Sequence, residues 1–400
     1  MPMTSQTAIS MKQVDVLFGP AKQQPQALQL LDNGKSREEI LEQTGIVLGV
    51  ADASLDVPAG SISVLMGLSG SGKSSLLRCV NGLNTVTRGV LEVTTRDGVV
   101  NVSTCKGREL RQLRRNNLAM VFQQFALLPW ASVRENIGFG LSVRGESDAA
   151  IRQQVDAQLE LVSLQAWADK PIHTLSGGMQ QRVGLARAFA TDADILLMDE
   201  PFSALDPLIR EHLQDELLEL QSRLKKTILF VSHDLDEALK LGNQISIMDG
   251  GRIVQTGTAN DIVFSSKTDY VSRFVANINP LSVLTADAIM QPLEQVGDHF
   301  EHAESGMIIR QEADGKTRVS YRGVECEVRT IDELSEQEQA PEELAEQRPQ
   351  TVHGVRPEMM VNSLLKLAAG SEYPILVQNG DGISCGLIRD SDILMALHSR

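Results

Sequence analysis

The sequence is poor in three features that mark common classes of protein. Aromatic residues make up 4% of its 400 residues, which argues against a surface that stacks on nucleic-acid bases. Basic residues are outnumbered by acidic ones, and the net charge of −15 argues against a general nucleic-acid binder. No apolar run reaches the roughly 18 residues that a membrane helix needs. We therefore expect a soluble chain with no nucleic-acid partner, whose role at any membrane comes through another protein.

Cysteine is also scarce. The four cysteines are Cys79, Cys105, Cys326 and Cys385, and no two form a C-x-x-C pair, so neither a zinc site nor a disulfide framework is indicated. The N-terminal residues do not follow the pattern of a secretory signal peptide. Reduced thiols in the cytosol are the simplest interpretation.

One stretch carries the strongest signal. Residues 67–74 read G-L-S-G-S-G-K-S and fit the phosphate-loop pattern G-x-x-x-x-G-K-[ST]. An apolar run at 62–66 predicts a buried strand before the loop, and residues 75–78 predict the first turn of a helix after it. The glycines let backbone N–H groups converge on phosphate oxygens at a helix N-terminus. Lys73 would then reach the β- and γ-phosphates of a nucleotide, and the Ser74 hydroxyl would bind Mg²⁺.

Strands and helices alternate through the first 278 residues. We predict strands at 11–19, 46–57, 62–66, 120–124, 195–200 and 227–232, and hairpins at 90–102 and 245–255. We predict helices at 109–116, 149–164, 176–190, 208–223 and 235–241, one that begins after Ser132, and a short one after the capping box at Ser36–Glu39. Such alternation predicts an α/β fold with a parallel sheet.

The character of the chain changes after about residue 279. Seven acidic residues between 332 and 346 stand against the lone Arg348, which predicts an acidic linker over 331–350. Beyond it we predict a helix at 361–369, strands at 373–378 and 383–388, and a last helix to residue 398 that Asp390 or Ser391 caps.

Polar side chains at strand ends could complete a site around the phosphate loop. Asp199 ends an apolar strand and would hold Mg²⁺ directly or through water. Glu200 follows it and would act as general base on a water that attacks the γ-phosphate. Gln123 closes another strand, where it would sense the metal and that water. His233 closes a third and would bond the γ-phosphate with a neutral imidazole.

These motifs, in this order, resemble the nucleotide-binding subunits of ABC transporters over roughly residues 11–278. The matching segments are 67–74 (Walker A), Gln123 (Q-loop), 175–180 as L-S-G-G-M-Q (signature), 195–200 (Walker B), 203–206 (D-loop) and His233 (switch histidine). The resemblance implies a P-loop ABC ATPase domain that has a parallel-sheet core, an antiparallel β subdomain and a helical subdomain. It also implies that two copies sandwich two ATP molecules head to tail, with Mg²⁺.

The same resemblance assigns further residues to the nucleotide. Ser176, Gly177 and Gly178 open a helix whose N–H groups would face the γ-phosphate of the other copy. The nucleotide set implied on this chain is Gly67, Ser69, Gly70, Gly72, Lys73, Ser74 and Ser75, with Asp206 from the D-loop. Phe18 matches the aromatic that stacks on adenine, although a core role remains its alternative.

A finer resemblance points to the ATP-binding subunits of glycine betaine, proline and choline importers. It rests on the insertion between Phe18 and Val57 and on the segments 64–70 and 122–129. It implies a membrane permease, an external substrate-binding protein that is periplasmic or lipid-anchored, and a peripheral place at the cytoplasmic face of the inner membrane. Leu127, Leu128 and Trp130 are candidate permease contacts, with core packing as the alternative.

The tail resembles a CBS module, a regulatory motif that these importers carry in tandem. Residues 351–400 resemble the second module, and 279–330 would be a degenerate first one. Asp392 stands where nucleotide-binding CBS modules have a ribose-binding Asp, whereas Arg389 replaces the usual Ser or Thr. We therefore expect a small α+β regulatory tail. Other small polar solutes as cargo, and a non-transport ABC ATPase, stay open as alternative functions.

Overall fold

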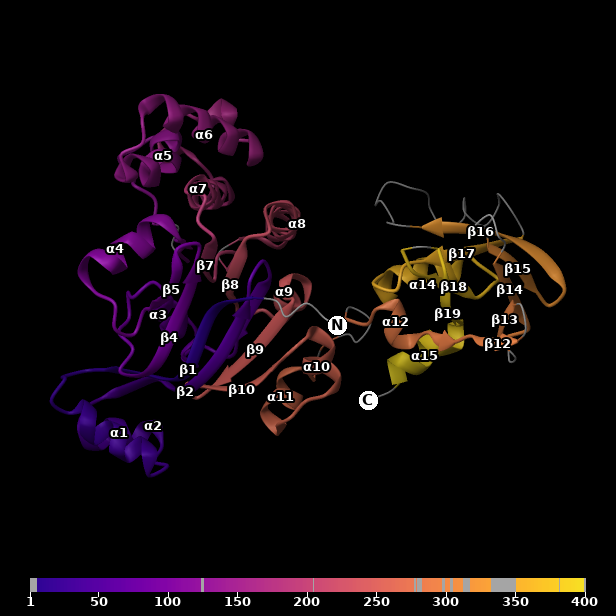
Figure 1. Cartoon of the computed structure of the whole chain (residues 1–400), viewed down its shortest axis with the longest axis horizontal. Helices are drawn as coiled ribbons and strands as arrows, with labels where there is room; N and C mark the ends of the chain where they lie inside the picture. Colours follow the sequence, from indigo (N-terminus) through magenta and orange to yellow (C-terminus); the bar gives the residue numbers. More distant parts are fainter. Residues whose placement is uncertain are drawn as a thin grey trace. The chain divides into compact units, whose positions relative to one another are not determined.

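The computed structural model describes residues 6–123, 126–203, 205–276, 278, 283–296, 299–302, 305–311, 317–331, 350–380 and 382–398. The chain forms two compact units, Met1–Val275 and Ala276–Arg400 (Figure 1). The sequence predicts this boundary at residue 278. Each described helix is too short or too polar to cross a bilayer.

A six-stranded sheet lies at the centre of the first unit, in the order β10-β9-β3-β8-β7-β6 (Figure 1). Its strands are β3 (Ile62–Met66), β6 (Leu118–Val121), β7 (Ile195–Asp199), β8 (Thr227–Val231), β9 (Gln244–Asp249) and β10 (Arg252–Gly257). All neighbours pair in parallel except β9 and β10, which form the predicted hairpin. Strands β3, β7 and β8 are buried at every residue, which explains their continuous apolar sequences. Their carboxyl ends meet at one edge of the sheet.

An antiparallel sheet of order β2-β1-β4-β5 packs beside this parallel sheet. It consists of β1 (Thr7–Phe18), β2 (Val47–Pro58), β4 (Arg88–Thr95) and β5 (Gly98–Asn101). Helix α3 (Lys73–Val80) belongs to the same core: Leu76 packs in one cluster with Leu55 of β2 and Leu197 of β7. The helix that carries the end of the phosphate loop is thus fixed by both sheets.

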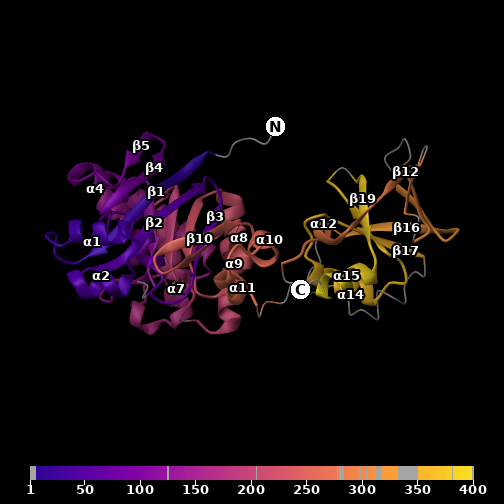
Figure 2. The same cartoon turned by 90° about the horizontal axis from the view of Figure 1, so that it is seen from below.

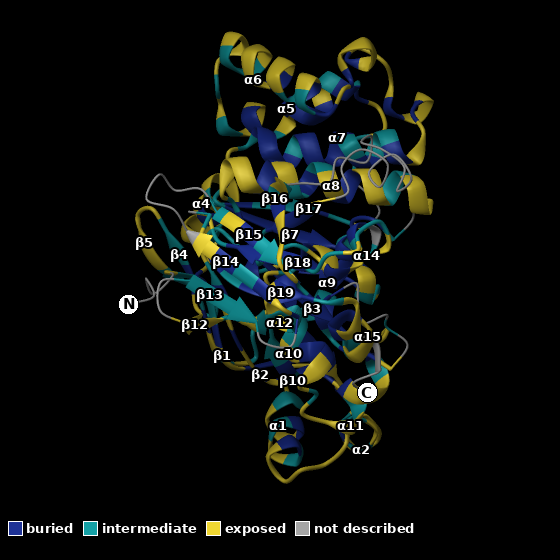
Figure 3. Ribbon diagram, turned by 90° about the vertical axis from the view of Figure 1, so that its right-hand side faces the viewer, coloured by how far each residue is buried: buried dark blue, intermediate teal, exposed yellow. Residues whose placement is uncertain are grey.

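Three helices form a subdomain around a core of their own. They are α5 (Val133–Arg144), α6 (Asp148–Leu161) and α7 (Gly177–Ala190), and their shared cluster includes Ile137, Leu159 and Val183. Ser132 caps α5 through a complete capping box with Glu135, as predicted. Figure 3 shows exposed residues along the outer side of α6.

The other helices of the first unit are α1 (Gln24–Asp32), α2 (Arg37–Thr44), α4 (Gly107–Asn116), α8 (Pro207–Leu224), α9 (Leu235–Leu241), α10 (Ala259–Phe264) and α11 (Asp269–Phe274). The sequence did not predict α1, which begins without a side-chain cap. The predicted strand 120–124 was wrong in its bounds. Strand β6 ends at Val121, where its pairing with β7 ends, so Gln123 lies in the loop beyond it.

The second unit is built on a nine-stranded sheet in the order β11-β19-β18-β17-β16-β15-β14-β13-β12. Its strands are β11 (Gln291–Pro292), β12 (Glu294–Val296), β13 (His299–His302), β14 (Met307–Gln311), β15 (Thr317–Tyr321), β16 (Val324–Ile331), β17 (Thr351–Val355), β18 (Ile375–Gln378) and β19 (Ser384–Ile388). Its helices are α12 (Ala286–Ile289), α14 (Val361–Ala369) and α15 (Asp390–His398) (Figure 2). The strands and helices predicted after residue 360 are confirmed, but the last helix already includes Asp390 and Ser391, so neither residue precedes it as a cap.

The second unit contains a β-meander that the sequence did not predict, and its predicted acidic linker falls largely outside the described residues. Strands β12 to β15 form an antiparallel meander that continues into β16, and the sequence did not predict it. These strands are short, and the first two carry few buried apolar residues. The predicted acidic linker falls on 331–350, of which 332–349 lie outside the described residues.

Candidate nucleotide site

The phosphate loop connects β3 to α3 in a backbone shape that needs glycine. Gly67 has φ +143°, and a Cβ there would lie 2.1 Å from the Met248 carbonyl oxygen. Gly72 has φ +102°, and its Cβ would lie 2.4 Å from the Gly49 carbonyl oxygen. Neighbouring strands therefore press on the loop from both sides, and only glycine fits.

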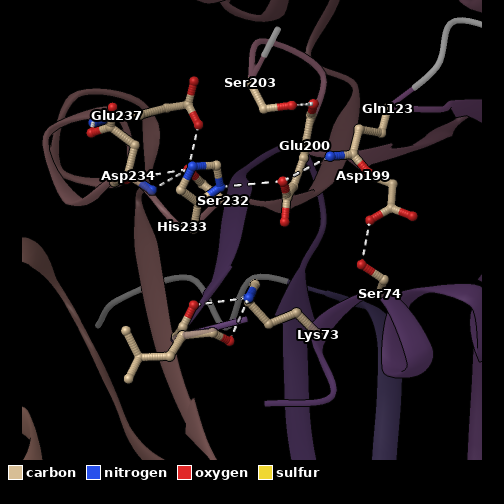
Figure 4. Close-up of polar contacts among 12 residues, drawn as sticks. Lys73, Ser74, Gln123, Asp199, Glu200, Ser203, Ser232, His233, Asp234 and Glu237 are labelled. Atoms are coloured by element: carbon tan, nitrogen blue, oxygen red, sulfur yellow. Dashed lines mark hydrogen bonds and ion pairs between the residues drawn. The ribbon is translucent and has the colours of Figure 1, made fainter. Parts of the chain in front are cut away.

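Lys73 lies folded into the loop. Its ammonium group donates to the carbonyl oxygens of Gly67 at 2.8 Å and Leu68 at 3.0 Å (Figure 4). The side chain is 4% exposed, and burial lowers the pKa of this lysine, while the carboxylates of Glu200 and Asp199 oppose the shift. The buried hydroxyl of Ser71, within the same loop, has no hydrogen-bond partner among the described residues. The Lys73 ammonium and the unpartnered Ser71 hydroxyl thus both lie in the loop where the motif predicts phosphate binding.

Asp199 joins the phosphate loop to strand β7. The Ser74 hydroxyl donates to its Oδ1 at 2.6 Å (Figure 4). Arg78, one turn further along α3, donates to Oδ2 from Nε at 3.0 Å and from Nη2 at 2.7 Å. The Asp199 side chain is 3% exposed, so the guanidinium compensates a buried charge. Sequence reasoning missed Arg78, which stands five residues after Lys73 but carries no motif of its own.

Glu200 lies between two of the predicted site residues. Its Oε2 accepts from Gln123 Nε2 at 3.2 Å and lies 3.2 Å from His233 Nδ1 (Figure 4). A bond from Nδ1 to the carboxylate requires the proton on that nitrogen, which leaves Nε2 of a neutral ring as an acceptor. Glu200 has φ +47°, a left-handed conformation that is uncommon outside glycine. Such backbone strain is found at sites where a side chain must be aimed.

A buried polar network lies behind His233 and was not predicted. Glu237 of α9 is 6% exposed, and it bonds the Ser232 hydroxyl and, at 3.1 Å, the Gln214 amide. Burial raises the pKa of this carboxyl. Asp234 caps α9 and pairs with Arg210 of α8 at 2.8 Å. The signal in the sequence is the acidic residue one helical turn after the strand-end histidine.

Phe18 stands at the end of β1, opposite Val47 of β2. It is 38% exposed, so it is not a core residue. Its ring covers Gly49, where a Cβ would lie 2.4 Å from a ring carbon. The ring therefore lies beside the strand that touches the phosphate loop at Gly72.

The remaining predicted residues lie apart from this cluster. Ser176 caps α7, and Asp206 caps α8 by accepting from the Ile209 N–H at 3.1 Å. Among the described residues, no hydrogen bond or ion pair joins Ser176, Gly177, Gly178 or Asp206 to the phosphate loop. Ser69 and Gly70 are exposed in the loop, while Ser75 lies in the first turn of α3.

In the second unit, Asp392 is fully engaged within the protein. It is 3% exposed and accepts from Arg389 through the backbone N–H at 2.8 Å, Nε at 3.1 Å and Nη2 at 3.0 Å. Gln291 of β11 donates to it at 3.3 Å. Hydrogen bonding to Arg389 lowers the pKa of Asp392, although burial acts in the opposite direction. Arg389 stands where the CBS pattern would have Ser or Thr, and it takes up hydrogen-bonding positions on the Asp392 carboxylate.

Comparison with known proteins gives concordant results. The family model described as ABC transporter matches residues 50–203. The glycine betaine transport ATP-binding protein OpuAA of Bacillus subtilis is 46% identical over 288 residues, which are 72% of this chain and 68% of that protein. The trimethylamine N-oxide transport system ATP-binding protein TmoW of Ruegeria pomeroyi is 43% identical over 303 residues, 76% of this chain and 86% of that one.

The fold agrees with a solved structure. The dimeric post-hydrolysis state of the ATP-binding cassette MJ0796, bound to ADP and Pi, superposes with a TM-score of 0.52 and 26% identity, over 62% of this chain and 98% of that one. The chain therefore belongs to the ABC transporter family, within the group of ATP-binding proteins that includes those of glycine betaine transport.

Proposed function

We propose that this chain is the ATP-hydrolysing subunit of an ABC importer for quaternary ammonium solutes such as glycine betaine, proline betaine or choline. The observation that carries the proposal is the meeting of Lys73, Ser74, Asp199, Glu200 and His233 at one edge of the parallel sheet (Figure 4). Phosphate ligands, a metal ligand and a base are then within reach of one another. The names of OpuAA and TmoW support the choice of cargo.

The phosphate loop would bind the triphosphate of ATP. Gly67, Ser69, Gly70, Gly72 and Ser75 would contribute backbone N–H groups, and Lys73 would exchange its two carbonyl partners for phosphate oxygens. The free hydroxyl of Ser71 and the cation of Lys73 suit an anionic ligand. Phe18 would stack on the adenine, which its exposure allows.

The residues present fit Mg²⁺. One hydroxyl, Ser74, and one carboxylate, Asp199, already bond each other, and Gln123 adds an amide oxygen. In the part of the chain that the structure describes, no group of three or more acidic, His or Cys side chains could hold a metal ion, so water and phosphate oxygens would have to complete the coordination of Mg²⁺. When bound, Mg²⁺ neutralises charge on the phosphates. Ser74, Asp199 and Gln123 would hold it.

Glu200 would act as the general base. Water attacks the γ-phosphorus as the bond to the ADP oxygen breaks, and the proton of the water passes to Glu200. Gln123 and His233 both bond Oε2 and so fix the direction of the carboxylate. Because the γ-phosphate only accepts hydrogen bonds, a neutral His233 would have to present its protonated nitrogen to the phosphate instead of to Glu200 once ATP is bound.

A second copy of the chain would complete each site. Among the described residues, Ser176, Gly177, Gly178 and Asp206 form no hydrogen bond or ion pair with their own phosphate loop, so they would be available to the loop of a partner. Gly177 is open enough for close approach, since a Cβ there would meet no atom within 4 Å. Closure of the homodimer on two ATP molecules would be the step that drives a membrane permease, with an external binding protein delivering the solute.

The permease would dock beside the loop that follows Gln123. Trp130 is 81% exposed there and is the best contact candidate. Leu127 instead packs on the core of α5, α6 and α7, which favours core packing over a permease contact for this residue. This arrangement corresponds to a peripheral subunit at the cytoplasmic face of the inner membrane. Another small polar solute, or a non-transport ABC ATPase, is the alternative function.

We also propose the second unit as a regulatory tail with CBS-like segments at 279–330 and 351–400, joined through the acidic linker 331–350. Since Arg389 and Gln291 occupy Asp392, the tail would not bind a ribose through that residue. The linker would respond to salt, because screening lengths change over physiological ionic strengths. Removing residues 280–400 should abolish the salt dependence of transport, and an unchanged salt dependence would refute this role.

The variant Glu200→Gln tests the proposed chemistry. It should bind ATP as the natural chain does, dimerise with it, and lose hydrolysis by roughly 10²- to 10⁴-fold, the usual contribution of a general base. Glu211→Gln, an exposed neighbour on α8, is the control and should hydrolyse ATP normally. Full ATPase activity in Glu200→Gln would remove Glu200 from this role.

A further inference from the structure

The helix pair α1–α2, inserted between β1 and β2, is fixed to the rest of the unit at two points. At the end of α1, Arg88 of β4 forms a two-fold ion pair with Asp32 at 2.8 and 2.9 Å. The same guanidinium donates to the buried Asp15 at 2.5 Å. A small core that includes Ala27, Leu31 and Ile40 packs the pair on the strands. The insertion is therefore a fixed part of the fold, beside β2 (Figures 1 and 2).

The second anchor is Arg37, the first residue of α2, and it touches the phosphate loop. Its Nη1 donates to the Gly70 carbonyl oxygen at 3.1 Å. Its Nε and Nη2 donate to the Leu48 carbonyl oxygen at 2.9 and 2.6 Å. The next residue of β2, Gly49, is the one whose carbonyl oxygen abuts Gly72. One guanidinium thus bridges the loop and the strand that confines it.

The bond to Gly70 has a consequence for phosphate binding. The peptide that joins Gly70 to Ser71 is planar and trans, so its C=O and N–H point in opposite directions. A donor that holds the Gly70 oxygen toward α2 therefore turns the Ser71 N–H to the opposite side, where it donates to the Leu68 carbonyl oxygen at 3.2 Å, one of the two carbonyl oxygens that Lys73 also bonds. Gly70 has φ +80° and no Cβ to restrain it, so an external restraint of this kind has an effect.

We infer that Arg37 is a positioning residue of the nucleotide site, and that the inserted helix pair acts through it to hold the phosphate loop in its binding conformation. The inference rests on the proposed function, because the loop must bind a nucleotide for its order to count. Arg37 also adds a fixed positive charge at the loop, which favours a polyphosphate ligand. Its planar fork donates to the two carbonyl oxygens from separate nitrogens with fixed N–H directions, a geometry that the single ammonium of a lysine does not reproduce.

The test compares Arg37→Ala and Arg37→Lys with the natural chain in full-length protein with Mg²⁺. We expect Arg37→Ala to raise the Kd for ATP and the KM of hydrolysis about 10-fold, in line with the loss of a charge-assisted hydrogen bond, with kcat little changed. Arg37→Lys should recover part of the affinity. Lys35→Ala is the matched control, since Lys35 lies two residues away and pairs with Glu39 at the exposed surface. It should bind ATP as the natural chain does.

Several outcomes decide the matter. Natural ATP affinity in Arg37→Ala, or an equal loss in Lys35→Ala, would overturn the inference. If Arg37→Ala does not fold, Arg37→Lys carries the test: weaker ATP binding at an unchanged Tm supports positioning, and natural affinity contradicts it. The variant Lys73→Ala separates the two proposals. If it leaves ATP binding intact, or if the natural chain binds no ATP, the proposed function itself fails.

Discussion

At the scale of single residues, the buried carboxyl of Glu237 lies behind His233, the proposed switch histidine. It lies one helical turn after His233 and bonds Ser232, the residue before that histidine. Burial raises the pKa of Glu237 above the ordinary glutamate value of 4.5 that applies in the unfolded chain. As the pH rises, the unfolded chain therefore loses this proton at a lower pH than the folded chain does. The stability contributed by this group is complete below pH 4.5 and is lost as the pH rises through the folded-state pKa.

The variant Glu237→Gln should therefore change the pH dependence of stability. Glutamine retains the shape and hydrogen-bonding capacity of the protonated acid, so its Tm relative to the natural chain should rise between pH 4.5 and pH 8. Thermal unfolding across this range measures the difference. The exposed variant Glu219→Gln is the control, and a difference that stays constant with pH would show that Glu237 does not titrate in this way.

The sequence predicted the site residues that follow strands of the parallel sheet. Lys73, Asp199, Glu200 and His233 all stand at the carboxyl ends of buried strands or just beyond them, and such ends converge whatever the loops do. Arg37, Arg78 and Glu237 were missed, because nothing in their local sequence names their partners. Arg78 and Asp199 are 121 positions apart in the sequence, and Arg37 and Gly70 are 33 positions apart. Only the packing of the folded chain brings each pair together.

At the scale of secondary structure, two of the three glycines in helix α7, Gly178 and Gly184, have opposite surroundings. A Cβ on Gly178 would lie 2.9 Å from Cγ2 of Ile209, whereas a Cβ on Gly184 would meet no atom within 4 Å. Gly184 therefore has no steric need for glycine and costs helix stability through chain entropy. Gly178 lies in the first turn of the helix, packed against α8.

The two alanine variants should differ in sign. Gly184→Ala should stabilise the chain by about 0.5–1 kcal/mol, the intrinsic advantage of alanine in a helix, and leave ATPase activity unchanged. Gly178→Ala should lower the free energy of unfolding, because the Ile209 side chain must move to make room for the added methyl group. Urea unfolding of both variants measures the difference. Equal stabilisation of the two would show that α7 and α8 are packed more loosely than the structure describes.

The sequence predicted elements wherever a local signal was complete. The capping box at Ser36 and the cap at Ser132 marked the starts of α2 and α5, and largely apolar runs marked β3, β7 and β8. Helix α1 and the meander of β12 to β15 were missed for a physical reason. Helix α1 has no side-chain cap, and the strands of the meander are stabilised by pairing with neighbours rather than by their own sequences.

At the scale of the whole molecule, the chain consists of two units with separate cores. Leu159 belongs to a cluster of buried residues in the first unit, and Leu284 belongs to a cluster in the second. We predict two unfolding transitions in calorimetry of Glu200→Gln. Mg-ATP at 100 times its Kd should stabilise the first unit by about 2.7 kcal/mol and leave the other transition in place. A single transition, or an equal shift of both, would show that the units unfold together.

The central claim is that ATP hydrolysis by this chain drives the import of a quaternary ammonium solute. The most direct measurement is uptake of labelled glycine betaine by vesicles that contain the complete transporter copurified with this chain, with ATP supplied on the side of this subunit. We predict uptake that requires ATP, stops with Lys73→Ala and Glu200→Gln, and is matched by ATP hydrolysis that the solute stimulates. Choline, proline betaine and trimethylamine N-oxide would be compared in the same assay. ATP hydrolysis that drives the uptake of none of these solutes would contradict the account.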